Sequence, residues 1–258
     1  MHHQKPDLML TVNRVLSKLI CYICIIGFTS ATSAMSDEQI AGDKATDIQS
    51  NVIEMKPELN THDNHLTEVE VNGAAVALAA ELSRVAHMSA SFTQQTVDRT
   101  LRVLQENTGR LWVNPGAKFR IETDAPSEQT LVSDGSSFWV YDADLEQVIV
   151  SKLEADLSQT PVLLLGGNLA EMNASYAISY YEDELGQNYV LSPLSSESLF
   201  TSLSISFQHS VPVRIAILDA LGQRTLIDLQ NVIASDQIEP AIFSFAPPVG
   251  TDVIDDRL

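Results

Sequence analysis

Few residues in this chain have the types and spacing that catalysis or metal binding requires. His62 and His65 are close enough in sequence to share a metal ion, but their polar segment offers no further ligand set. His87 and His209 stand apart, and no motif places a nucleophile beside either of them. We therefore expect no metal site and no cofactor, and we expect a solvated loop at His62 and His65.

The acidic residues also lack a spacing suited to acid–base chemistry. Glu182, Asp183 and Glu184 are consecutive, which is typical of a solvated hairpin turn. The chain has no G-x-S-x-G, H-E-x-x-H, P-loop or G-x-G-x-x-G motif. These observations predict that the protein is not an enzyme.

The first 34 residues have the pattern of a cleavable export signal. Lys5, Arg14 and Lys18 precede an apolar run over residues 19–28, and small residues follow at 32–34. Such a run is too short to cross a bilayer core of about 30 Å as a helix. We predict a signal peptide over residues 1–34 and a periplasmic protein, with an uncleaved anchor helix as the alternative.

Both cysteines lie within this predicted signal. Cys21 and Cys24 each follow an isoleucine, whereas a lipid-attachment site needs a small residue there. The net charge of the chain is −19, and without residues 1–34 it becomes −21. Such a surface repels phosphate backbones, so nucleic acid is not expected as a partner.

The rest of the chain divides into an acidic spacer over residues 35–72, expected to be mostly disordered, and a folded domain over 73–258. An apolar stripe of Leu78, Leu82, Val85 and Met88 predicts that the domain opens with a helix, capped by Asn72 or Gly73. Alternation around Phe92 then indicates a strand.

Alternation and turn residues predict about eleven short strands with short connections, which favours a curled antiparallel sheet. After the strand around Phe92, the predicted strands cover residues 100–104, 108–113, 118–123, 130–133, 137–141, 147–151, 176–182, 187–191, 203–208, 213–218 and 224–229. A helix that starts at Thr160 and Pro161 interrupts them, with four apolar residues before a Gly-Gly stop. This helix is either buried in the core or covers an apolar opening.

Several segments resemble, in order and spacing, a known family. They are SASFTQQ, GRLWV, KFRIE, LVSDGSSFWVYD, EQV, TPVLLL and FSFAPPVGTDVID, which together span about residues 74–256. The family is the periplasmic outer-membrane lipoprotein carrier protein of the LolA type. The resemblance implies a mainly β fold with helices, an incomplete antiparallel β-barrel covered by a helical lid that encloses an apolar cavity.

The resemblance also implies a function. A member of this family binds the acyl chains of lipoproteins released by an ABC-type complex of the inner membrane and delivers them to an outer-membrane receptor. We expect a monomer. The alternatives are a related half-barrel that binds lipid or lipoprotein as a periplasmic sensor or regulator, the lipid-anchored receptor of the same pathway, and a protein-binding adaptor.

Matched positions and strand alternation indicate which residues line the expected cavity, although ordinary core packing is the alternative for each. The acyl-binding candidates are Leu82, Phe92, Phe119, Ile121, Leu131, Val162 and Leu165.

One segment departs from the family pattern. Family members commonly carry an arginine between the Trp-containing strand and the KF strand, where it holds the lid closed. This chain has Asn114 and Pro115 there, and Arg120 is expected to point away from the face of Phe119 and Ile121. The lid is therefore expected to be looser or held by another group.

Overall fold

The computed structural model describes residues 68–153, 169–184, 186–196 and 198–257. It opens with helix α2 (Glu68–Arg84), which buries Leu78 and Leu82. The helix begins before Asn72 and Gly73, so the expected cap at these residues is wrong. A single glycine within a helix costs only about 1 kcal/mol, so Gly73 does not interrupt α2.

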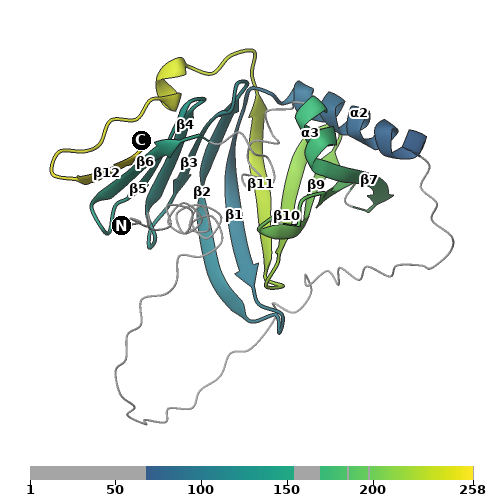
Figure 1. The fold of residues 1–258 in the computed structure, drawn as a ribbon, viewed down its shortest axis with the longest axis horizontal. Coiled ribbons are helices and arrows are strands. Elements are labelled where there is room, and N and C mark those ends of the chain that lie inside the picture. The colour runs from purple at the N-terminus through teal and green to yellow at the C-terminus, as the bar shows by residue number, and fades with distance from the viewer. Residues whose placement is uncertain (1–67, 154–168, 185, 197, 258) are drawn as a thin grey trace, which may run out of the picture.

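Twelve strands follow and form one sheet (Figure 1). They are β1 (Met88–Val97), β2 (Val103–Asn114), β3 (Lys118–Thr123), β4 (Gln129–Asp134), β5 (Ser137–Asp142), β6 (Gln147–Lys152), β7 (Tyr176–Asp183), β8 (Gly186–Pro193), β9 (Phe200–Gln208), β10 (Val211–Asp219), β11 (Arg224–Ala234) and β12 (Asp252–Asp256). Helix α3 (Leu169–Ser175) precedes β7, and the 3₁₀-helix η2 (Pro240–Phe243) follows β11.

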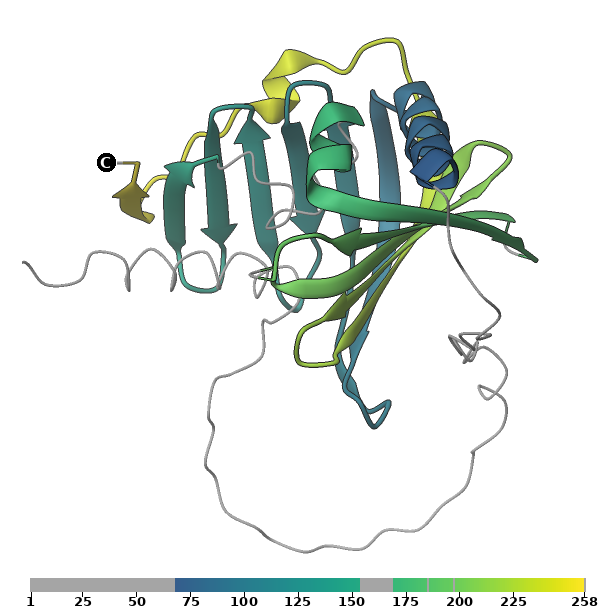
Figure 2. The ribbon, with the colours of Figure 1, turned by 45° about the vertical axis from the view of Figure 1, so that its right-hand side comes forward.

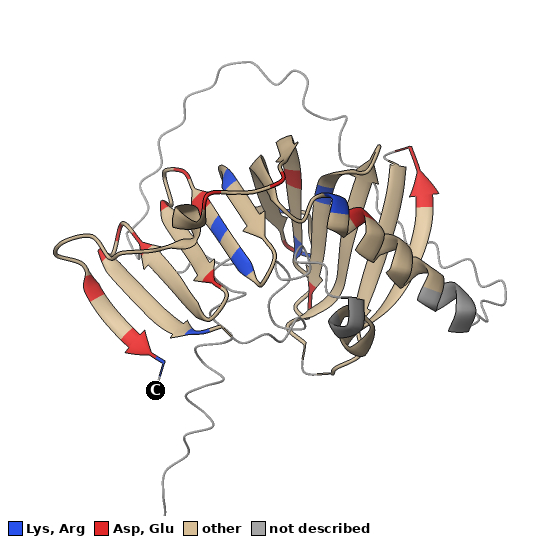
Figure 3. Cartoon of the chain, turned by 90° about the horizontal axis from the view of Figure 1, so that it is seen from above, with Lys and Arg blue, Asp and Glu red and all other residues tan. Residues whose placement is uncertain are grey.

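The strand order is β12-β6-β5-β4-β3-β2-β1-β11-β10-β9-β8-β7. Two antiparallel meanders, β1–β6 and β7–β11, are joined where β1 pairs with β11. The outermost strands, β12 and β7, do not pair with each other, which confirms the predicted incomplete barrel. Both edge strands carry acidic residues (Figure 3), a feature that discourages pairing with other chains.

Two details of the strand prediction are wrong. Residues 100–104 are not a separate strand, because Thr100 and Arg102 lie in a turn whose backbone N–H groups donate to the Asp98 carboxylate, and Val103 begins β2. The twelfth strand, β12, was not predicted, and it pairs parallel to β6. All five of its side chains are exposed, so it shows no apolar alternation.

The two faces of the sheet are covered by different parts of the chain. Helices α2 and α3 lie on the same side and pack against each other and against β7 (Figure 2). Between them and the sheet lies the main apolar cluster. No helix among the described residues is long and apolar enough to span a membrane.

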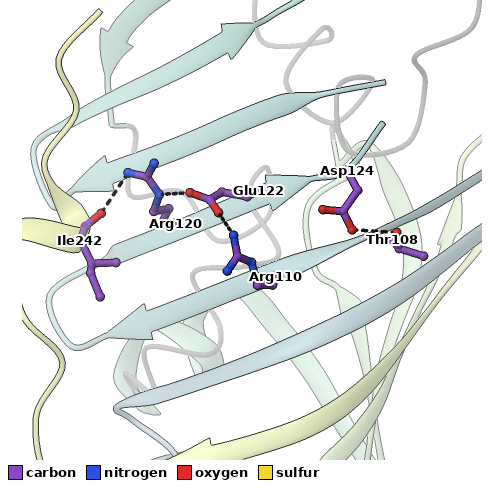
Figure 4. Close-up of polar contacts among 6 residues, drawn as sticks. All are labelled: Thr108, Arg110, Arg120, Glu122, Asp124 and Ile242. Carbon is purple, nitrogen blue, oxygen red and sulfur yellow. Dashed lines mark hydrogen bonds and ion pairs between the residues drawn. The ribbon is translucent and has the colours of Figure 1, made fainter. Parts of the chain in front are cut away.

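The segment after β11 covers part of the opposite, outer face. Here η2 contacts β3 and β4, and Phe243 is buried. The rings of Phe245 and Tyr141 lie 5.9 Å apart, between centroids. Arg120 points to this face, as the sequence predicts, and its Nη1 donates to the carbonyl of Ile242 at 3.3 Å (Figure 4). The C-terminal segment therefore holds the outer face of the first meander.

Candidate functional site

The inner face of the sheet brings together five of the seven predicted acyl-binding residues. Leu82 of α2, Phe92 of β1, Phe119 of β3 and Leu131 of β4 all belong to the main buried cluster. Ile121 is partly buried and packs against it. The strand register explains this arrangement, because Ile121 lies opposite Leu131 across the ladder of β3 and β4, and alternate residues of one strand share a face.

The cluster is closed to solvent. Leu82 is fully buried, and Phe119 is only 2% exposed. The ring of Phe119 lies 5.7 Å from that of Phe138, between centroids, at an interplanar angle of 47°. A tilted aromatic pair of this kind stabilises the packing beyond the area it buries.

Val162 and Leu165 lie outside the described residues, as does the predicted helix that carries them. The chain re-enters the described structure at α3, where Met172 is fully buried in the same cluster.

The predicted site did not include the residues that the second meander contributes to the cluster. Tyr189 and Phe207 make an edge-on contact with centroids 5.8 Å apart, and Tyr176 stacks with Phe200 at 6.1 Å. The apolar alternation of β9 from Leu203 onward places these side chains on one face of the strand, but it does not show that this face joins the same cluster as the first meander. The pairing of β9 with β8 and β10 brings this face to the cluster.

A polar group lies at the edge of this apolar cluster, at the C-terminal end of α2. Glu81 is 92% buried, and its Oε1 accepts a hydrogen bond from Nη1 of Arg84 at 2.6 Å. The same nitrogen donates to the hydroxyl of Ser210, in the β9–β10 turn, at 2.9 Å. Arg84 therefore ties the helix to the second meander. Burial, and next the charge of Glu81, raise the pKa of Tyr189 to about 12.

The two histidines of the folded region take separate positions. The Nδ1 of His87 contacts the Asn114 side chain, so His87 links the connection after α2 to the end of β2. His209 lies in the β9–β10 turn. Within the described stretches, no three His, Cys, Asp or Glu residues are grouped as metal ligands would be. The chemistry that the site offers is contact with an apolar ligand.

The fold and this face define a class of protein: an open half-barrel with an apolar inner surface beneath a helix. Residues 83–246 match the family described as "Outer membrane lipoprotein carrier protein LolA". The chain belongs to this family.

Curated relatives agree with the family match. An outer-membrane lipoprotein carrier protein of Pseudomonas aeruginosa is 37% identical over 189 residues, which cover 73% of this chain and 91% of the relative. One from Alcanivorax borkumensis is 39% identical over 178 residues, 69% of this chain and 85% of the relative. The crystal structure of a LolA superfamily protein from Nitrosomonas europaea aligns with a TM-score of 0.41 and 12% identity, over 67% of this chain and 98% of that one.

Proposed function

We propose that the protein is a periplasmic carrier that binds the acyl chains of lipoproteins on the inner face of its half-barrel. It would receive them from an ABC-type release complex in the inner membrane and deliver them to an outer-membrane receptor. The observation that carries this proposal is the apolar cluster between α2 and the sheet, in a member of the LolA family. Its relatives are named as lipoprotein carriers.

The physical need for such a carrier follows from the cargo. Each methylene buried from water contributes about 0.8 kcal/mol, so one long acyl chain is worth roughly 10 kcal/mol. Acyl chains therefore leave a membrane very slowly unless another apolar surface receives them. The inner face of the sheet offers such a surface without any reaction being needed.

Loading would require an exchange of apolar contacts. Leu82 and Phe119 are buried in the same apolar cluster. We propose that α2 swings outward during loading and that acyl chains take the place of its side chains. The proposed contacts are Leu82, Phe92, Phe119, Ile121 and Leu131, with Val162 and Leu165 from the segment that is not described. The tie between Arg84 and Ser210 would restrain this movement in the empty protein.

Ile121 offers the sharpest test of the site, because it borders the cluster without being fully buried. Ile121→Glu places a charge where acyl chains would lie, while the partial exposure lets the fold survive. Ile233→Glu is the matched control, since Ile233 is 59% exposed on β11. Both variants are purified from the periplasm and analysed by native mass spectrometry for a bound acylated polypeptide.

We expect one acylated polypeptide per protein monomer in the wild type and in Ile233→Glu, and a loss of cargo in Ile121→Glu. Normal loading of a folded Ile121→Glu variant would exclude the inner face as the binding surface. A bound free lipid in place of a lipoprotein would indicate a lipid-binding relative with another role. Depletion of the protein is expected to leave lipoproteins in the inner membrane, and their normal sorting would contradict the carrier role.

A further inference from the structure

Two neighbouring hairpin turns gather exposed apolar side chains at one end of the sheet. The first is the β1–β2 turn and the second is the β10–β11 turn, and we call residues 98–104 and 218–224 together the hairpin tip. The turns touch, because a Cβ added at Gly222 would lie 2.4 Å from Nε of Arg99. The exposed apolar residues of the tip are Leu101 (53%), Val103 (48%), Leu104 (42%), Leu218 (36%) and Leu221 (63%).

The same turns carry three exposed arginines, Arg99, Arg102 and Arg224. Arg102 pairs with Asp98 at 3.1 Å, whereas within the described part of the chain neither Arg99 nor Arg224 pairs with an acidic group. The tip also contains two acidic residues, Asp98 and Asp219, whose carboxylates accept hydrogen bonds from the turns. Asp98 accepts from the backbone N–H of Thr100 at 2.8 Å, and Asp219 accepts from that of Gln223 at 2.7 Å. With three arginines and two aspartates, the tip presents apolar groups and a small excess of positive charge, although the net charge of the chain is −19.

The first hairpin projects beyond the rest of its meander (Figure 2). β2 begins at Val103, but its pairing with β3 begins only at Gly109. Six residues of strand correspond to roughly 20 Å. Because charges are screened over about 8 Å at physiological ionic strength, the tip can reach a charged surface before the acidic turns of the first meander do.

We propose that the hairpin tip docks on an anionic bilayer, with its leucines and valine in the headgroup region and its arginines on lipid phosphates. Apolar side chains beside basic ones are the combination that binds such an interface. A specific protein interface usually buries about 800 Å² from 20–30 residues on each side. The tip offers only eight side chains, five apolar ones and three arginines. A narrow, projecting surface fits a deformable membrane better than a rigid partner.

This proposal needs no cargo, so it is tested on the empty protein. The protein is prepared in the processed form that cells produce, with its N-terminus determined by mass spectrometry, because the apolar run at residues 19–28 would itself bind lipid. Co-sedimentation is measured with vesicles of phosphatidylethanolamine and phosphatidylglycerol, and with vesicles of phosphatidylcholine. We expect salt-sensitive binding to the anionic vesicles.

Two double variants separate the apolar and cationic contributions. Leu101→Asn/Leu221→Ser removes the two most exposed leucines of the tip, and asparagine suits the left-handed backbone at Leu101, where φ is 64°. It is expected to weaken binding to anionic vesicles about tenfold. Arg99→Gln/Arg224→Gln is expected to abolish the preference for anionic over neutral vesicles.

Val253→Ser/Ile254→Ser is the control, because these β12 side chains are 47% and 45% exposed and lie far from the tip in the strand order. It is expected to bind like the wild type. No binding of the wild type to anionic vesicles, or an equal loss in the control, would overturn the proposal. Loss of a protein partner in the tip variants, without any vesicle binding by the wild type, would also overturn it in favour of a protein interface. None of these results bears on cargo binding by the inner face.

Discussion

Gly109 of β2 lies directly beneath the ring of Phe92 on β1. A Cβ at Gly109 would lie 2.7 Å from Cζ of Phe92 and 2.1 Å from the carbonyl oxygen of Glu122. Real side chains do not approach so closely, so the absence of a side chain at Gly109 leaves room for the ring of Phe92 in the inner-face cluster.

Gly109→Ala is therefore expected to be destabilising. The backbone oxygen of Glu122 cannot move without breaking the β2–β3 ladder, and overpacking of this kind costs about 1–3 kcal/mol. Gly73→Ala is the control, because nothing lies within 4 Å of that position in α2 and alanine favours a helix by about 0.5–1 kcal/mol. Urea unfolding should show opposite shifts of the two midpoints, and equal midpoints would contradict the close contact.

Phe119 is expected to contribute strongly to stability. Phe119→Ala should cost about 3–5 kcal/mol, because the side chain is buried and contacts Phe138. Phe245→Ala, at a half-buried position on the outer face, should cost clearly less. Thermal unfolding of the two variants checks this ranking. The reverse order would show that the C-terminal segment on the outer face contributes more to stability than the inner cluster does.

Arg120 is expected to hold the C-terminal segment. Arg120→Ala removes the hydrogen bond to the carbonyl of Ile242 and the 2.7 Å pair with Glu122, a loss of about 1 kcal/mol. Amides of residues 240–256 should then exchange hydrogen faster. Arg110→Ala is the control, because Arg110 shares the Glu122 carboxylate but does not bind the C-terminal segment. Faster exchange in both variants would show that the effect comes from loss of the ion pairs to Glu122 and not from loss of the hydrogen bond between Arg120 and Ile242.

The raised pKa of the Tyr189 phenol predicts that the folded protein loses stability at alkaline pH. Its pKa is raised from 10.0 to about 12 in the folded protein. Below pH 10 both states keep the proton; between pH 10 and 12 the unfolded state releases it while the folded state does not, so stability falls as pH rises. Tyr189→Phe should show a shallower fall in its urea midpoint across this range. An unchanged slope would contradict the buried position of the phenol.

The sequence predicts the strands of this fold well because most of them have one buried face. Lys118–Thr123 was predicted at its observed bounds, and the alternation that revealed it also places Phe119 and Ile121 on the inner face. β12 escaped prediction because an exposed strand has no alternation and exists only through pairing with β6. The turn at Asp98 escaped because its carboxylate, and not a glycine or proline, forms it.

The candidate site was predicted in part for a similar reason. Residues of the first meander, such as Phe92 and Leu131, were found because their strands show clear alternation and family motifs. Tyr189 and Phe207 were missed because local patterns do not reveal which face of a strand meets a helix from another part of the chain. That information lies in the pairing between distant strands.

The pairing of β1 with β11 has a consequence for how the chain folds. Phe92 lies opposite Leu229, so the central ladder of the sheet joins segments separated by most of the domain. Until β11 is available, β1 has an open edge, and a first meander formed early is exposed to aggregation. Because such non-local ladders form slowly, the arrival and docking of the last long strand should limit the rate of folding.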